Sequence, residues 1–305
     1  YVTLVDENAK FPEADSALNN AAVSFEKGKR FESAMNMYQR IVDDYPNSPR
    51  ADAALFRVGV NATNFFDFDS ALQTYKQLIK NYPKSERRAD AFYNVAFALE
   101  QTQQYEEAAK QYLRYCDVFP ERDDAADVCF RAGIIYEKME EPARVISTYK
   151  NFIRKYQKDE RFHARVLEAH LKIAQSYEHL MNEPKARGKA KLNAGKNAQE
   201  RYETLLEKFQ AKPDSKAAAY AAESAFKLLE PQYKTYFGFE FRGSDEKQQK
   251  DLMRQLENLK TLSKDYTSIL KYKQVEWMLA SLYRAASLYH RLTEQMFASE
   301  CPPEY

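Results

Sequence analysis

The sequence predicts an all-α fold, in which helical hairpins stack into a solenoid closed at its C-terminal end by a helical cap. Pro46, Pro83 and Pro120 lie 37 residues apart in three similar junctions, and such a period is typical of hairpins that bury their cores only against their neighbours. The chain has 7 Gly and 11 Pro but is 30% charged and 14% aromatic, which disfavours disorder and all-β folds. Its 305 residues exceed one compact core unless that core follows a repeat array.

The charge balance argues against several classes of partner. Forty-six basic and 45 acidic residues give a net charge of +1, which predicts neither nucleic acid nor a strongly acidic substrate. No segment approaches the roughly 20 apolar residues that span a bilayer, and the mean hydropathy is −0.71. The sequence starts at Tyr1 without a Met. A signal peptide or lipid anchor lost before it would not be visible, and we expect membrane contact only through such an anchor or a partner.

Two helices with a fixed pattern precede each of these prolines. The first carries a small residue where the paired helices must approach closely: Ala22, Gly59, Ala96 and, after the last proline, Gly133. The second carries an alanine, an aromatic and a large residue on one face: Ala34, Tyr38 and Ile41, then Ala71, Tyr75 and Leu78, then Ala108, Tyr112 and Tyr115. The proline ends this helix. Ser48 and Ser85 are expected to cap the helices that follow.

These positions together resemble the tetratricopeptide repeat, which implies a right-handed α-solenoid of helix hairpins. A fourth unit has Val145 for the alanine and Gln157 for the proline, so we expect residues 1–157 to form four units, three clear and one degenerate. Residues 158–230 are expected to be degenerate repeat-like helices with a basic insertion, in which a displaced second helix carries Tyr202. Residues 231–305 are expected to form an aromatic loop and a C-terminal helical hairpin.

The 37-residue unit with its Tyr-Pro-x-Ser junction is similar to the bacterial envelope branch of this family. That branch includes the outer-membrane lipoprotein of the β-barrel assembly machinery and the periplasmic coordinator of the Tol-Pal system. The segment from Ala280 to Pro303 is similar to large repeat proteins of deltaproteobacteria, including components of gliding machinery. The resemblance implies a periplasmic or outer-membrane-associated protein; a cytoplasmic location is the alternative.

In such a superhelix the first helices line a concave surface, through the residues three before and one after each small residue. The candidate partner-binding residues are therefore Asn19, Val23, Phe56, Val60, Tyr93, Phe97, Phe130 and Ile134. Exposed apolar rows of this kind fit an extended peptide or an amphipathic helix; the alternative is that neighbouring repeats bury them. Glu26, Glu100 and Glu137 either give this surface an acidic rim or form an ordinary solvated face.

A basic stretch interrupts the repeats, with Lys185, Arg187, Lys189, Lys191 and Lys196 and no acid between Glu183 and Glu200. It is a candidate contact for anionic lipid or an acidic partner, or simply a solvated helix face. It lacks the interleaved aromatics of a nucleic-acid site.

The C-terminal part is expected to begin with an aromatic loop from Tyr233 to Gly243. A helix from Ser244 to about Lys271 then carries a three-four seam: Leu252, Leu256, Leu259, Tyr266 and Leu270. This seam packs either on the last helix, Val275–Phe297, or on another chain. Intramolecular packing is favoured, since a terminal repeat needs a cover.

No pattern for catalysis, a metal or a cofactor is found. The three cysteines, Cys116, Cys129 and Cys301, match no zinc spacing and are expected to be free thiols; a disulfide between Cys116 and Cys129 is the alternative. His163 and His170 lie two helical turns apart, too far for a simple metal site, and no Gly-rich phosphate loop or nucleophile elbow occurs.

The function predicted from these observations is a non-catalytic scaffold or adaptor. It would bind a peptide or helix of partner proteins in a multiprotein assembly. The resemblance places this assembly in the cell envelope, with gliding or envelope-transport machinery as the narrower prediction. The alternative is a structural or assembly protein that oligomerises through its C-terminal helices. The sequence does not predict the oligomeric state.

Overall fold

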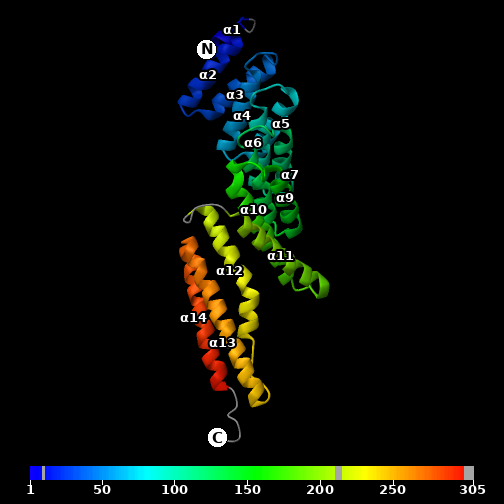
Figure 1. The fold of residues 1–305 in the computed structure, drawn as a ribbon. Helices are drawn as coiled ribbons and strands as arrows, with labels where there is room; N and C mark the ends of the chain where they lie inside the picture. Colours follow the sequence, from blue (N-terminus) through cyan, green and yellow to red (C-terminus); the bar gives the residue numbers. More distant parts are fainter. Residues whose placement is uncertain (9–10, 210–214, 299–305) are drawn as a thin grey trace. The chain divides into compact units, whose positions relative to one another are not determined.

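The computed structural model describes residues 1–8, 11–209 and 215–298. Within them it contains fourteen α-helices and no β-strand (Figure 1), which confirms the all-α solenoid class. The chain divides into two compact units, Tyr1–Arg144 and Val145–Tyr305. The helices are α1 Val2–Glu7, α2 Ala14–Lys27, α3 Phe31–Asp44, α4 Ala51–Asn64, α5 Phe68–Asn81, α6 Arg88–Gln101, α7 Tyr105–Val118, α8 Ala125–Lys138, α9 Pro142–Tyr156, α10 His163–Asn182, α11 Gly188–Lys208, α12 Lys216–Phe237, α13 Asp245–Ser268 and α14 Val275–Ala298.

The first unit is a stack of helical hairpins. Helices α2 to α8 are each 14 residues long, and each packs on the next along the chain. After each first helix a non-glycine residue adopts the left-handed conformation, and the next N–H bonds to the carbonyl five residues earlier. This combination is the Schellman helix end. The left-handed residues, again 37 positions apart, are Lys29, Phe66, Gln103 and Glu140.

A buried tyrosine on each second helix fills the space beside the small residue of the first helix. Tyr38, Tyr75 and Tyr112 are at most 1% exposed. A Cβ atom added to Gly59 would lie 2.7 Å from Cε1 of Tyr75, closer than carbon atoms can approach. The predicted role of the small residue in helix pairing is therefore confirmed at Gly59, where an added Cβ would force the ring of Tyr75 or the helices to shift.

A carboxylate in the last turn of a first helix links successive hairpins. Tyr112 donates its hydroxyl hydrogen bond to Glu100 at 3.0 Å, and Arg131 of the next hairpin donates two more, at 2.9 and 3.1 Å. The corresponding group in the first hairpin comprises Glu26, Tyr38 and Arg57. An acidic rim is the wrong interpretation for both carboxylates, because each is paired with an arginine and largely buried.

The two serines after the prolines tie hairpins together in addition to binding the backbone at the start of the next helix. Ser48 donates a hydrogen bond to Asp15 of the preceding hairpin and accepts one from the N–H of Arg50 at 3.0 Å. Ser85 donates in the same way to Asp52. The helices begin after Arg50 and Arg87, and each serine accepts a hydrogen bond from the N–H of that arginine, at 3.0 and 3.1 Å. The serines thus bind the backbone at the helix start in the manner of a capping side chain, as predicted. The hydrogen bond from Ser48 is the main reason that the pKa of Asp15 lies below its usual value.

Helices α7 and α8 are joined covalently. Cys116 and Cys129 form a disulfide with Cα atoms 5.8 Å apart, within the usual span for such a bond. The expectation of free thiols is wrong for this pair, and the alternative holds because the turn between the helices brings two buried faces together. Cys301 lies outside the described residues.

The second unit keeps the hairpin order with longer helices. Helices α10 to α14 contain 20 to 24 residues, so the 37-residue period is lost. Tyr202, Ala198 and Leu205 of α11 are buried in the core that α11 shares with α10 and α12. The displaced second helix predicted around Tyr202 is therefore confirmed.

The link between hairpins recurs in this unit. Arg284 of α14 donates two hydrogen bonds to Glu230 of α12, at 2.9 and 3.0 Å, and Tyr266 of α13 donates a third at 3.3 Å. One hairpin earlier, Lys227 of α12 lies 2.8 Å from Glu178 of α10. A carboxylate on one helix thus again holds a basic residue of the next first helix.

The predicted aromatic loop is helical in its first part. Helix α12 extends to Phe237, so the first five residues of the stretch from Tyr233 to Gly243 are helical, and Tyr233 and Tyr236 are buried. Burial raises the pKa of Tyr236 to about 12. Because only the residues after Phe237 leave the helix, the aromatic side chains contribute to the core of α12, α13 and α14.

Intramolecular packing of the α13 seam is confirmed in part. Leu259 and Tyr266 are buried in the unit's core, together with Leu262. Leu256 is 41% exposed, contrary to the predicted seam. The buried face of α13 thus changes direction along the helix. Helix α13 packs on α12 and α14 mainly through its second half.

We predict that Gly59→Ala lowers the melting temperature, with a cost of about 1–3 kcal/mol for overpacking against Tyr75. Thermal unfolding followed by far-UV circular dichroism measures this change. Gly28→Ala is the matched control, because its added Cβ would lie 3.5 Å from the nearest backbone oxygens, an ordinary contact. An equal loss in both variants would mean that the close approach at Gly59 is not limiting.

We predict that the folded protein loses stability in acid because His170 is buried. Burial, with smaller contributions from Arg201 and Lys208, lowers its pKa from 6.5 to about 4. The unfolded chain takes up this proton near pH 6.5 and the folded chain only near pH 4, so stability present above pH 6.5 falls as the pH drops toward 4, by up to about 3 kcal/mol. His170→Leu should remove this part of the loss.

Urea unfolding at pH 7 and pH 4.5 tests this expectation. The single tryptophan, Trp277, lies in the same unit and reports on it by fluorescence. If wild type and His170→Leu lose the same stability between the two pH values, protonation of His170 is not the cause.

Candidate partner-binding surfaces

The first predicted row of the concave face packs largely on the repeat core. The rings of Phe56 and Tyr75 lie 5.7 Å apart, as do those of Tyr93 and Tyr112. Phe56, Tyr93 and Asn19 are half-buried. Phe130 is 1% exposed and offers no surface, contrary to its predicted place on an open face. This row therefore supports the second-helix tyrosines more than it faces solvent.

The second predicted row remains accessible. Val23, Val60 and Phe97 are half-buried, and Ile134 is 47% exposed. These four residues occupy the same position in four successive first helices, α2, α4, α6 and α8. They consequently form an apolar row, one residue per hairpin, along the first unit.

The sequence reasoning did not identify an aromatic group at the turn between α4 and α5. Phe65 is 52% and Phe66 79% exposed. The rings of Phe66 and Phe68 lie 6.1 Å apart, and those of Phe68 and Phe97 lie 6.2 Å apart. The turn thus extends the apolar row at Phe97. The available signal was Phe66, because the equivalent residues of the other hairpins, Lys29, Gln103 and Glu140, are polar.

Phe66 also has an unusual backbone. Its φ is +61°, and a bulky residue in the left-handed region carries a conformational cost of about 1–2 kcal/mol. Lys29, Gln103 and Glu140 share this conformation, so what distinguishes Phe66 is its exposed aromatic side chain. We therefore define the aromatic face as Val60, Phe66, Phe68, Phe97 and Ile134.

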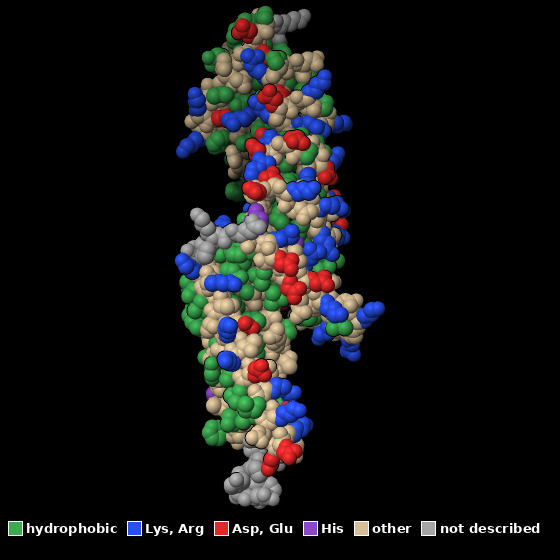
Figure 2. Space-filling view, in the orientation of Figure 1, with side chains coloured by type: hydrophobic (Ala, Val, Ile, Leu, Met, Phe, Trp, Pro, Cys, Tyr) green, Lys and Arg blue, Asp and Glu red, His purple; other side chains and the backbone are tan. Residues whose placement is uncertain are grey.

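The predicted basic stretch lies at the end of the α10–α11 hairpin, where Figure 2 shows Lys and Arg side chains gathered. Lys185 and Arg187 precede α11, and Lys189, Lys191 and Lys196 lie within its first half. All five are exposed. Only Lys191 and Lys196 line a groove, which α11 forms with α12 and the end of α10.

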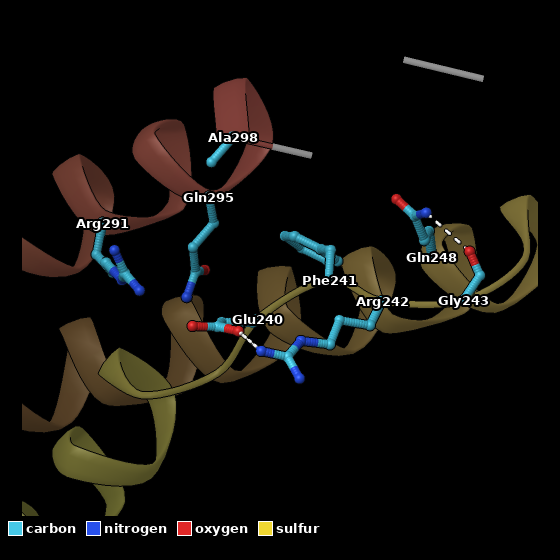
Figure 3. A pocket seen from close by; sticks show the side chains of 8 residues that line it. All are labelled: Glu240, Phe241, Arg242, Gly243, Gln248, Arg291, Gln295 and Ala298. Carbon is cyan, nitrogen blue, oxygen red and sulfur yellow. Dashed lines mark hydrogen bonds and ion pairs between the residues drawn. The ribbon is translucent and has the colours of Figure 1, made fainter. Parts of the chain in front are cut away.

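A polar cavity of about 510 Å³ lies where the chain leaves α12 and α14 ends. Figure 3 shows Glu240 paired with Arg242 and Gln248 donating to the carbonyl of Gly243, at 2.9 Å in the second case. Gln295 of α14 is buried and donates to the carbonyl of Phe239. The hydrogen bond from Gln295 thus holds the segment after α12 against α14.

Helix α14 has an exposed apolar face. Val275 and Leu279 are 71% and 64% exposed, and Tyr283 and Phe297 are 70% and 91% exposed. In Figure 2 hydrophobic side chains follow the edge of the second unit that this helix occupies. The face lies opposite the buried side of α14, which includes Ala285, Leu288 and Leu292.

Neither a metal site nor a membrane span is found within the described residues. Among them, no group of three or more His, Cys, Asp or Glu side chains is placed to hold a metal ion, and His170 is buried rather than a surface ligand. No helix in the described part is long and apolar enough to cross a bilayer.

The tetratricopeptide repeat family model matches residues 16–48, 53–85 and 90–122. These segments correspond to the hairpins α2–α3, α4–α5 and α6–α7, which are therefore tetratricopeptide repeats. A search of curated protein sequences found no match.

Solved structures with a similar arrangement include MamA, at 17% identity and a TM-score of 0.42, covering 65% of this chain and 93% of that chain. MamA from Desulfovibrio magneticus has 14% identity and a TM-score of 0.39, with 63% and 93% covered. YrrB, described as a repeat protein with an unusual peptide-binding site, has 14% identity and a TM-score of 0.42, with 73% and 97% covered.

Proposed function

We propose that this tetratricopeptide-repeat chain is a non-catalytic scaffold that binds an apolar segment of a partner protein on the aromatic face of its first unit. The observation that carries the proposal is the accessible row Val60, Phe97 and Ile134, extended by Phe66. Exposed apolar surface that continues over several repeats is typical of a site for an extended peptide or an amphipathic helix.

The charge around this face supports a largely apolar mode of recognition. Arg57 and Arg131 lie next to the row on the first helices, but each is bound to a carboxylate of the preceding hairpin. The charged groups nearest the row are thus occupied in holding the repeats together. Specificity would come from the size and spacing of apolar side chains, one pocket for each hairpin.

We also place the scaffold in an oxidising compartment such as the bacterial cell envelope. The disulfide between Cys116 and Cys129 favours this location, since structural disulfides persist mainly outside the reducing cytosol. The resemblance of the 37-residue unit to envelope repeat proteins agrees with it. A role in gliding or envelope-transport machinery is the narrower form of the proposal and rests on that resemblance alone.

We predict that Phe66→Gly weakens peptide binding without lowering the stability of the fold. Glycine removes the exposed ring and relieves the left-handed backbone, so stability should hold or rise by up to about 1 kcal/mol while peptide binding falls. Peptides selected by display on the wild-type protein provide the ligands, and fluorescence anisotropy gives the affinities. We expect a loss of about tenfold or more.

Gln103→Gly is the matched control for this variant. Gln103 occupies the same left-handed position one repeat later and exposes no apolar side chain, so this variant should gain stability and keep its affinity. Selected peptides that bind Phe66→Gly as tightly as Gln103→Gly would refute the proposed use of the aromatic face.

A second candidate function is self-association through α14. Its exposed residues Val275, Leu279, Leu282, Ala286 and Tyr289 alternate at spacings of four and three, the repeat of a coiled-coil seam. The face also offers Tyr283 and Phe297, and a covered aromatic side chain buries about 150–250 Å². The face thus approaches the roughly 800 Å² that each partner buries in a standard interface. A second copy would place an identical apolar face against it.

Light scattering across micromolar concentrations tests the second candidate. The full chain should be a dimer, and the double variant Leu279→Glu with Leu282→Glu should be a monomer of unchanged helicity. Leu192→Glu places the same charge at another exposed leucine and should remain a dimer. A wild-type chain that is monomeric throughout would exclude self-association through this face.

A further inference from the structure

The second unit holds a groove of about 500 Å³ along α11 and α12, beside the last turns of α10. Its residues on α11 run from Lys191 to Tyr202 at three-four spacing, and those on α12 run from Lys227 to Lys234 in the same way. One face of each helix therefore forms a wall. The groove exists because both helices are longer than the 14-residue helices of the repeats.

The walls of the groove are mainly apolar. Met181, Leu192, Ala198 and Pro231 line it, and Leu192 is 60% exposed. At Gly195 an added Cβ would lie 3.1 Å from the sulfur of Met181. A small residue at this position therefore keeps the groove open where α10 and α11 approach. Exposed leucine on a lysine-rich helix is otherwise unfavourable in water.

The rim carries positive charge that the protein does not neutralise. Lys191, Lys196 and Lys234 border the groove, and none of them makes an ion pair within the described residues. The two acids in the lining are occupied: Glu178 binds Lys227 and Glu230 binds Arg284. Three lysines therefore border the groove without an ion-pair partner of their own, an arrangement that attracts carboxylates.

One backbone group of α12 beside the groove lacks its usual partner. Pro231 has no N–H, so the carbonyl of Lys227 is without its helical hydrogen bond. The hydroxyl of Tyr202 is buried and lies beside Glu178, so it is not open to a ligand. A bound segment could therefore donate a hydrogen bond to the carbonyl of Lys227.

From this charge complementarity we propose that the groove binds an acidic amphipathic segment of a partner protein. Its apolar side chains would enter between α11 and α12, and its flanking Asp or Glu residues would pair with Lys191, Lys196 and Lys234. This site lies in the second unit and does not depend on the aromatic face. A scaffold with both sites would hold two segments of different chemistry.

A membrane surface fits the geometry less well. The three lysines surround a hollow rather than projecting from one plane, and the apolar residues lie in that hollow. A bilayer presents a flat array of headgroups, whereas a peptide can place its side chains inside. Among the five basic residues predicted from the sequence, only Lys191 and Lys196 reach the groove, which gives a matched set for comparison.

Fluorescence anisotropy with two designed peptides on the full-length chain tests the proposal. One labelled helical peptide has Leu and Phe on one face with Glu on both flanks; the other has Lys in place of every Glu. We expect the acidic peptide to bind at least about tenfold more tightly and to weaken as salt is added. Equal binding of the two peptides would overturn the proposal.

Three variants locate the binding site. Lys191→Glu with Lys196→Glu should lower affinity for the acidic peptide about tenfold or more, whereas the matched pair Lys185→Glu with Lys189→Glu, outside the groove, should change it by less than about threefold. Leu192→Ser removes an exposed apolar wall residue and should also weaken binding. Far-UV circular dichroism checks that all variants stay folded.

Vesicles containing phosphatidylglycerol distinguish a membrane contact. If they bind the chain, and both lysine pairs weaken that binding equally while the acidic peptide does not bind, the basic end contacts lipid and the peptide proposal fails. If only the groove pair affects the peptide, the proposal stands whatever happens to binding at the aromatic face.

Discussion

The stack of hairpins depends on one contact that combines a steric and an electrostatic constraint. A buried tyrosine of the second helix lies against the first helix. In the α2–α3 and α6–α7 hairpins its hydroxyl reaches a carboxylate that also holds an arginine of the next hairpin, and in the α4–α5 hairpin it meets the hydroxyl of Thr63. Glu100, Tyr112 and Arg131 show the full set. Burial is the main reason that the pKa of Tyr112 is raised, so the phenol stays a neutral donor. Pairing within a hairpin and stacking between hairpins are thereby coupled.

The second unit shows that this contact does not require the 37-residue spacing. Glu230, Tyr266 and Arg284 repeat it with helices of more than 20 residues. Longer helices change the distance in sequence between the partners but not the order in which the chain supplies them. The order of carboxylate, tyrosine and base thus recurs in both units, but not in the α4–α5 hairpin, where Thr63 replaces the carboxylate and contacts the hydroxyl of Tyr75.

The parts of the fold that were predictable from the sequence are those set by local spacing. The small residue, the tyrosine and the proline recur at fixed distances, so the first hairpins and the position of Tyr202 follow from the pattern. The pairing of Glu26 with Arg57 and of Ser48 with Asp15 did not follow from the pattern. These partners lie one hairpin away, and charge alone does not reveal pairing. The extent of α12 was missed because aromatic residues were interpreted as loop where they are core.

The candidate binding sites were also predictable from the sequence only in part. The two rows of the concave face were predicted from position, but only the structure shows that Phe130 is buried and Ile134 exposed. Phe66 follows no periodic rule, since it lies in a turn, whereas Phe68 begins α5 at the position that Phe31 and Tyr105 hold in the neighbouring repeats. The lysines at Lys191 and Lys196 were predicted as a surface, while their apolar counterpart on α12 is supplied by residues more than 30 positions later, which no local pattern connects.

The left-handed turns have a consequence for how such a protein can change. Lys29, Phe66, Gln103 and Glu140 adopt the same backbone conformation with the same Schellman hydrogen bond, although they are basic, aromatic, amide and acidic. Backbone hydrogen bonding fixes each turn and leaves its side chain outside the core. The scaffold can therefore exchange the chemistry displayed at each repeat independently, at equal intervals, without altering the architecture that presents it.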